Sequence, residues 1–182
     1  PYMTTIGGQR QLLVQTRTNL VGVDPETGAE LWVQPVKSFR GMNILTPTVF
    51  EDGVFVSTYG GTTQMLGVSG TSNAYNITPR WNLPAQGYMT SPVIVDGRAY
   101  IHLRNQRFAC FDLKNGKETW RSKPFGKYSS LVSNGKQILA LDQRGDLMLI
   151  NANPEEFEVV DTRKVAEDSW AHLAVRGDEV FV

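Results

Sequence analysis

The sequence is poor in cysteine, with Cys110 as the single thiol among 182 residues. One thiol excludes an internal disulfide and any zinc site built from several cysteines. Because Cys110 lies in the apolar run Phe-Ala-Cys-Phe, it is interpreted as a buried strand residue rather than a reactive nucleophile. The sequence also has no apolar run near the roughly 18 residues that a membrane-spanning helix needs, so no membrane span is predicted.

The chain also has no excess of positive or negative charge. Eighteen lysines and arginines balance eighteen aspartates and glutamates, which gives a formal net charge of zero. Nucleic-acid-binding proteins usually carry a clear excess of positive charge, and a neutral chain offers no such signal. The composition therefore predicts no nucleic acid partner.

Helical periodicity and enzyme signatures are absent as well. No stretch sustains the apolar period of 3.6 residues that marks an amphipathic helix. The nucleophile elbow, the P-loop and the dinucleotide fingerprint do not occur. The two histidines, His102 and His172, stand alone in the sequence, and no nearby ligand set completes a zinc site. Each is interpreted as a packed inner-strand residue, and His172 is kept as a weak ligand candidate.

A repeat is the strongest feature that the sequence does contain. The stretch VGVDPETGAELW, which ends at Trp32, returns as ACFDLKNGKETW, which ends at Trp120. The two tryptophans are 88 positions apart, which is twice 44. A fixed period of this size indicates an array of similar structural units. Residues that the copies share are expected to belong to the scaffold, so function is sought in the positions that differ.

Each repeat unit contains short apolar runs separated by turn signals. Asp52-Gly53, Asp96-Gly97 and Asn134-Gly135 are dipeptides that favour tight hairpin turns. Four short strands in about 40 to 45 residues are typical of a propeller blade. The sequence therefore predicts an all-β fold, a β-propeller of four-stranded blades in one domain, 1–182. The predicted blades span 2–34, 44–83, 88–122 and 128–161, with a partial fifth at 170–182.

The partial fifth blade leaves an edge rich in valine and phenylalanine, and soluble proteins avoid such edges. We therefore expect this chain to be part of a larger ring of seven or eight blades. Self-association through the open blade edges is the alternative.

The stretch from Val23 to Trp32 resembles the tryptophan-docking motif of the pyrroloquinoline-quinone (PQQ) enzyme-like repeat family, approximately A-x-D-x-x-T-G-K-x-x-W. The resemblance implies that the tryptophan of each outer strand packs across the boundary between blades. Trp81 ends the second unit without the glycine turn. In the fourth unit Asn151-Ala152-Asn153-Pro154 replaces that turn, and Val159 or Val160 stands where tryptophan is expected. The predicted structural set is Asp24, Gly28, Trp32, Trp81, Asp112, Gly116 and Trp120.

The family includes quinoprotein dehydrogenases, and the resemblance implies PQQ and calcium as cofactors only if this chain belongs to such an enzyme. One cysteine excludes the adjacent-cysteine disulfide that several of these enzymes use. Asp142 and Asp146 could suit a cation, but Arg144 lies between them and calcium gathers 6–8 oxygen ligands. We therefore predict no catalytic, cofactor or metal residue within this chain.

Because the strands of a blade run alternately up and down, each charged loop residue can be assigned to one of the two faces of the propeller. Loops between second and third strands share one face with the links between blades, and loops on a rigid scaffold commonly carry binding. This face is expected to be basic and to bind a protein or an anionic small ligand, although solvated loop charges are the simpler explanation. The candidate residues are Arg17, Arg40, Arg104, Arg107, Arg144 and His172.

Two functions follow from the resemblance. The first is a non-catalytic binding or scaffolding propeller, similar to the propeller lipoprotein that belongs to the outer-membrane assembly machinery. The second is a fragment of a PQQ-dependent alcohol or sugar dehydrogenase whose cofactor ligands lie outside this chain. In both cases a periplasmic or otherwise exported location is implied by the resemblance alone, and the sequence itself shows no signal peptide.

Overall fold

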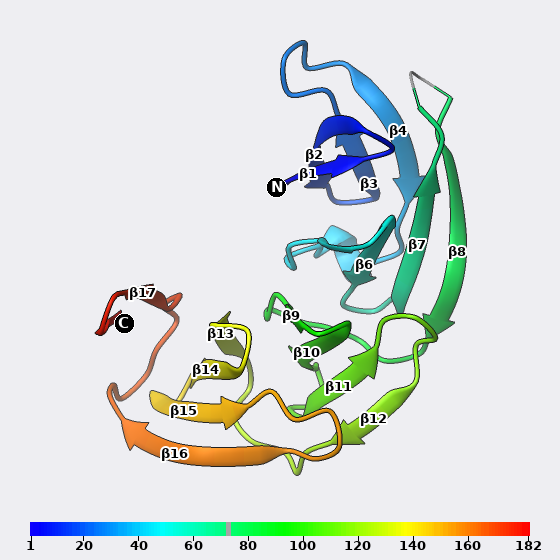
Figure 1. The fold of residues 1–182 in the computed structure, drawn as a ribbon. Helices are drawn as coiled ribbons and strands as arrows, with labels where there is room; N and C mark the ends of the chain where they lie inside the picture. Colours follow the sequence, from blue (N-terminus) through cyan, green and yellow to red (C-terminus); the bar gives the residue numbers. More distant parts are fainter. Residues whose placement is uncertain (72–73) are drawn as a thin grey trace. The chain divides into compact units, whose positions relative to one another are not determined.

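The computed structural model describes residues 1–71 and 74–182, and nearly all of its regular structure is β-strand. The chain divides into two compact units, Pro1–Tyr88 and Met89–Val182. Both units are built from four-stranded antiparallel sheets in which strands adjacent in sequence are also neighbours in space (Figure 1). Among the described residues the one helical element is the short 3-10 turn η1 (Phe39–Gly41). The all-β prediction is confirmed.

The first unit contains two blades. The strands of the first blade are β1 (Tyr2–Ile6), β2 (Gln9–Gln15), β3 (Asn19–Val23) and β4 (Glu30–Pro35). The strands of the second blade are β5 (Thr48–Phe50), β6 (Gly53–Ser57), β7 (Thr63–Ser69) and β8 (Asn76–Leu83).

The second unit contains two further blades and a hairpin. The third blade consists of β9 (Val93–Val95), β10 (Arg98–His102), β11 (Phe108–Asp112) and β12 (Glu118–Arg121). The fourth blade consists of β13 (Ser129–Ser133), β14 (Gln137–Asp142), β15 (Asp146–Asn151) and β16 (Glu158–Lys164). The hairpin consists of β17 (Ala174–Arg176) and β18 (Glu179–Phe181).

The first strand of several blades starts later than the sequence predicts. The hairpin begins at Ala174, so Trp170 and His172 precede its first strand. The prediction that His172 is a packed inner-strand residue is therefore wrong, because it is exposed and lies outside the strand. The residues before β17 instead form a link, in which the Leu173 amide donates to Ser130 Oγ at 3.0 Å.

The hairpin turns use positive φ angles in two ways. Asp96 and Gly97 both have positive φ, at 46° and 71°, as an Asp-Gly hairpin turn predicts. In the second blade Glu51 takes the positive φ of 54° instead of Gly53. Gly53 is required there for space, because a β-carbon would lie 2.7 Å from Met65 Sδ.

The repeated turn has the same local structure in both copies. Asp24 Oδ1 accepts the Glu26 amide at 2.8 Å, and the Gly28 amide donates to Asp24 O at 2.9 Å. In the second copy Asp112 Oδ1 accepts the Lys114 amide at 2.8 Å, and the Gly116 amide donates to Asp112 O at 2.8 Å. Both glycines have φ near 75°, which favours glycine over other residues.

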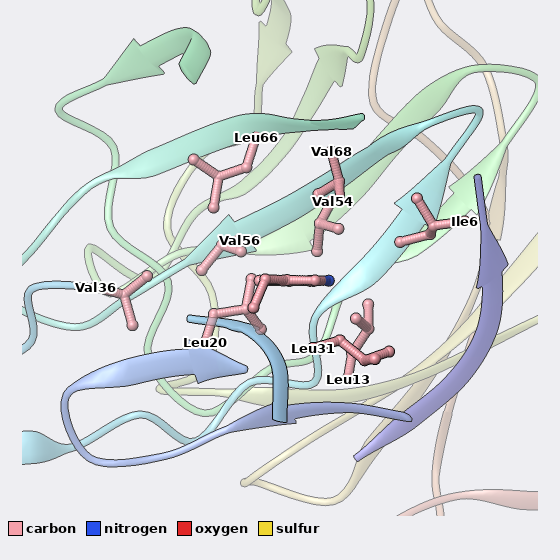
Figure 2. Packing of buried hydrophobic residues seen from close by; sticks show 10 residues of the cluster. Ile6, Leu13, Leu20, Leu31, Val36, Val54, Val56, Leu66 and Val68 are labelled. Carbon is pink, nitrogen blue, oxygen red and sulfur yellow. The ribbon is translucent and has the colours of Figure 1, made fainter. Parts of the chain in front are cut away.

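The core of the first unit lies between its two blades. Trp32 is 5% exposed and belongs to an apolar cluster that combines first-blade residues with residues of β6 and β7. Figure 2 shows the labelled aliphatic side chains of both blades pointing toward one another. The cluster consists of Ile6, Leu13, Leu20, Leu31, Trp32, Val36, Val54, Val56, Leu66 and Val68. Burial of these side chains holds the two sheets face to face.

The core of the second unit joins the third and fourth blades in the same way. Its buried members are Val95, Tyr100, Phe108, Cys110, Ile138, Ala140, Met148 and Ile150. Cys110 is 0% exposed, as the sequence predicted, and burial raises the pKa of its thiol. A buried thiol with a raised pKa is a poor nucleophile.

Candidate functional site

Each blade has one end where the loop between its second and third strands meets the links between blades. We call this end the link edge, and hydrogen bonds show that its segments pack together within each unit. In the first unit the Phe39 amide donates to Tyr59 O at 2.6 Å, and Thr58 Oγ1 donates to Lys37 O at 2.7 Å. In the second unit the Phe125 amide donates to Gln106 O at 2.8 Å. The link edge is therefore an ordered surface.

The link edge of the first unit brings two predicted arginines together. Arg17 lies between β2 and β3, and its Nη2 donates to Arg40 O at 3.3 Å. Arg40 lies in η1, where its φ is 53°. Both side chains are exposed, and neither forms an ion pair with any carboxylate of the described residues. Two unneutralised guanidinium groups thus share one small surface.

An aromatic row lies beside these arginines, and the sequence did not predict it. The ring centroids of Phe39 and Tyr59 are 5.4 Å apart with an edge-on geometry, and those of Tyr59 and Tyr88 are 5.0 Å apart. The Arg40 Cζ lies 5.0 Å from the centroid of the Phe39 ring, within the range of a cation–π contact. The one signal for this row in the sequence was the glycine pair Gly60-Gly61, which marks a place where another segment can approach closely. In the structure that segment is Phe39, and a β-carbon on Gly60 would lie 2.5 Å from Phe39 Cβ.

In the second unit Arg144 is bound to its own loop. Asp142 is buried, and its Oδ2 accepts Arg144 Nε and Nη2, each at 2.9 Å. Arg144 Nη2 also lies 3.4 Å from Asp146 Oδ2. The guanidinium thus stands between the two carboxylates that the sequence marked as a conceivable cation site. Among the residues that the structure describes, no three His, Cys, Asp or Glu side chains gather where a metal ion could be held.

The remaining predicted residues of the second unit are spread along its link edge. Arg107 Nη1 donates to Ser122 O at 2.7 Å and ties the third blade to the following link. Arg104 and His172 are exposed. Arg107 and Arg144 therefore stabilise local structure.

His102, at the end of β10, is 1% exposed. Its Nε2 is 2.9 Å from Phe125 O, and its Nδ1 is buried without a hydrogen-bond partner. Burial lowers the pKa of the imidazole below its usual value, while the backbone groups of Phe125 and Gln106 and the charge of Asp142 act in the opposite direction. His102 is thus a neutral, hydrogen-bonded interior residue at neutral pH.

His102 should make the folded state sensitive to mild acid. The unfolded chain binds a proton on this ring below about pH 6.5, whereas the folded chain resists protonation, so stability is lost as the pH falls below that value. We expect urea unfolding at stepped pH to show a loss of up to about 1 kcal/mol per pH unit from this group. The His102→Gln variant should lose this dependence, and His172→Gln, at an exposed site, should keep it. Equal profiles for the two variants would contradict the assignment.

Two of the outer-strand tryptophans, Trp32 and Trp120, belong to the apolar clusters that join neighbouring blades within each unit. Trp32 Nε1 donates to Gln11 Oε1 at 2.7 Å. Trp120 Nε1 donates to Asn153 O of the fourth blade at 2.8 Å. Trp81 is paired with Met65, and its ring lies 6.0 Å from Phe55. In all three blades the tryptophan follows a β-bulge in the outer strand pair.

The fourth blade has Asp161 at the tryptophan position. The bulge between Leu149 and Ile150 precedes the pair Leu149–Asp161, just as the corresponding bulges precede the three tryptophan pairs. The prediction that Val159 or Val160 holds this position is wrong, because the preceding turn is longer than in the first and third blades. A hollow of about 260 Å³ lies here, lined by Leu139, Leu147, Leu149, Asp161 and Arg163.

The fold is also found in known proteins. The sheets define a β-propeller built from PQQ-like repeats of four-stranded blades. The sequence profile of the family described as "Outer membrane protein assembly factor BamB" matches residues 2–122, and the chain belongs to this family. No curated protein sequence matches the chain. Among the described residues no helix is long and apolar enough to cross a membrane.

Solved structures show the same fold at low sequence identity. BamB from Moraxella catarrhalis is similar with a TM-score of 0.72 and 14% identity, covering 98% of this chain and 52% of that one. The computationally designed Ika8 protein is similar with a TM-score of 0.65 and 8% identity, covering 98% of this chain and 53% of Ika8. The β-propeller domain of Cps50 (Swd1) from Myceliophteria thermophila is similar with a TM-score of 0.58 and 10% identity. That match covers 86% of this chain and 54% of the Cps50 domain. The chain thus spans about half the length of these structures.

Proposed function

We propose that this chain is a non-catalytic binding or scaffolding module that holds a protein partner against its link edge. The family description, an outer membrane protein assembly factor, supports a role in assembly and an exported, periplasmic location. A propeller offers a rigid frame for such a role, because its loops can vary while its sheets stay constant. PQQ and calcium have no part in this proposal.

The observation that carries the proposal is the unneutralised charge of the first unit's link edge. Arg17, Lys37 and Arg40 are exposed there and form no ion pair among the described residues. Exposed cations at the rim of an interface attract and orient an acidic partner more than they add affinity. At the corresponding edge of the second unit Arg144 is already paired with Asp142 and Asp146.

A photo-cross-linking experiment in the native cells tests the proposal. A benzophenone amino acid replaces Ile44, which is exposed in the link after the first blade, or Glu51, which is exposed in the opposite hairpin turn. We expect light-dependent adducts with a protein from position 44 and few or none from position 51. The double variant Arg17→Glu, Arg40→Glu should reduce the adduct at position 44 about tenfold, because both charges are reversed.

Two outcomes would overturn the proposal. One is equal adduct formation at positions 44 and 51, which would show that the link edge is not a preferred surface. The other is dye reduction with an alcohol or sugar when the whole protein is supplied with PQQ and calcium. That result would favour the dehydrogenase alternative.

A further inference from the structure

We infer that the link edge of the first unit binds an extended acidic protein segment that inserts an apolar side chain against an aromatic row. The row consists of Phe39, Tyr59 and Tyr88, and Arg17 and Arg40 lie beside it. We call these five residues the aromatic–basic patch. The inference rests on the proposed function, because it names the chemistry of the partner that the link edge would bind.

The rings of the patch offer apolar area at an exposed place. Phe39 is 45% exposed although its backbone amide is fixed to Tyr59 O, and Ile44 in the same link is also 45% exposed. Single exposed apolar side chains are common on protein surfaces, whereas contiguous ones mark interaction surfaces. Phenylalanine, tyrosine and arginine are the residue types that are enriched at the centres of protein interfaces. The composition of the patch thus favours a protein partner with an apolar anchor.

The patch is held rigid by bonds that run between its segments. Ser38 Oγ donates to Arg17 O at 3.1 Å, and Asn43 Nδ2 donates to the carbonyls of Thr16 and Arg17 at 2.8 and 3.1 Å. The Gly60 amide donates to Gln86 Oε1 at 3.1 Å. A surface that is ordered before binding loses little conformational entropy when a partner arrives.

Glycines allow the close packing on which this order depends. Gly41 has a φ of 72°, and a β-carbon there would lie 2.7 Å from Arg17 Nε. Gly60 has a φ of 72° and packs directly on Phe39. Any larger residue at either place would push an arginine or the phenylalanine out of position. The aromatic and basic side chains are therefore placed by the backbone rather than left to random loop motion.

The charge of the patch is of one sign. The four segments that form it, residues 15–19, 36–47, 57–63 and 84–88, contain Arg17, Lys37 and Arg40 and no aspartate or glutamate. The opposite edge of the same unit carries Glu26, with its partner Arg10, and Asp52, with its partner Arg80. Charge complementarity thus selects an acidic segment for the link edge.

A nucleic acid fits these observations less well. Aromatic rings and arginines can stack bases, but single-strand binding proteins add a groove of cations that follows several phosphates. The segments that form this patch provide three cations, Arg17, Lys37 and Arg40, and the whole chain has a net charge of zero. An acidic protein segment needs no more than that.

Peptide binding to the whole protein tests the inference by fluorescence anisotropy. The probe is a labelled peptide of about ten residues that alternates aspartate and leucine, a length that suits an extended binding mode. Control peptides alternate aspartate with serine or lysine with leucine. We expect the Asp-Leu peptide to bind about tenfold more tightly than the Asp-Ser peptide, since the apolar anchor is missing from the latter. The Lys-Leu peptide should not bind.

Matched variants locate the binding surface. Phe39→Ala should weaken the Asp-Leu peptide about tenfold, whereas Met3→Ala, at a side chain of nearly equal exposure in β1, should not change it. Arg40→Ala should weaken binding and reduce its salt dependence, whereas Arg10→Ala should leave both unchanged. All four positions are exposed, so each variant should keep the melting temperature of the unaltered protein.

The outcomes separate this inference from the proposed function. Failure of the Asp-Leu peptide to bind, equal effects of Phe39→Ala and Met3→Ala, or tighter binding of an oligothymidine to the same patch would overturn the inference. If the peptide experiment fails in one of these ways but position 44 still gives its light-dependent adduct, the proposed function stands and only the chemistry assigned to the patch is wrong. If position 44 gives no adduct in the otherwise unaltered protein either, both the inference and the proposed function are wrong.

Discussion

Replacing Trp120 with alanine should lower the free energy of unfolding of the unit Met89–Val182 by about 3 kcal/mol, the scale of large aromatic truncations in cores. The indole lies 6.0 Å from the Tyr100 ring, 5.8 Å from the Phe108 ring and 5.6 Å from the Phe157 ring, measured between centroids. Its N–H also donates to Asn153 O across the boundary between the third and fourth blades. Alanine removes the aromatic contacts and leaves that carbonyl without its donor.

Chemical denaturation of the whole protein measures this effect, and Trp170→Ala is its matched control. Trp170 is 67% exposed and contacts Tyr128 at a centroid distance of 4.8 Å, so its loss should cost less than about 1 kcal/mol. Trp120→Phe separates the two parts of the effect, because it keeps an aromatic ring and removes the donor. Similar losses for the alanine variants at 120 and 170 would show that Trp120 does not join the blades.

The repeated turn could be predicted from sequence because its bonds are local. Asp24 and Asp112 each cap a turn whose partners lie two to five residues away, and the glycines at 28 and 116 supply the positive φ. Short-range chemistry of this kind repeats whenever the residues repeat. The strand order followed for the same reason, since hairpins connect neighbours in sequence.

The tryptophan position of the fourth blade could not be found by counting along the sequence. Trp32 follows Val23 by nine positions, and Trp120 follows Phe111 by nine positions. In the fourth blade the equivalent pair is Ile150 and Asp161, and Asp161 follows Ile150 by eleven positions. The longer turn shifts the register, and only the hydrogen-bonded pairing of β15 with β16 shows where the bulge falls.

The candidate site was predicted in part. Strand alternation assigns Arg17 and Arg40 to one edge, and the structure brings them into contact. The aromatic row required a contact between two loops far apart in sequence, because Tyr59 meets both Phe39 and Tyr88. Arg144 was misleading for the opposite reason, since its own loop supplies the carboxylates that neutralise it. Loop charge counted from sequence says nothing about which cations are already paired.

Gly22→Ala is expected to destabilise the first unit by about 3 kcal/mol, although it adds only one methyl group. A β-carbon at this position would overlap Nε1 and Cε2 of the Trp32 indole and lie 2.9 Å from Gln11 Oε1. The indole has no room to retreat, because Trp32 is 5% exposed and packs in the apolar cluster. Glycine within a strand is otherwise unfavourable, so its presence at 22 reflects the indole that lies across it.

A double-mutant cycle with Trp32→Leu tests this explanation by urea denaturation. If the cost of Gly22→Ala comes from the indole, it should fall below about 1 kcal/mol once the indole is absent, because contacting residues are not additive. The third blade provides a natural comparison, since Cys110 faces Trp120 where Gly22 faces Trp32. Cys110→Ala should therefore be mild, at about 1 kcal/mol, because a side chain already has space there. An undiminished cost of Gly22→Ala in the Trp32→Leu background would instead assign the loss to the backbone of β3.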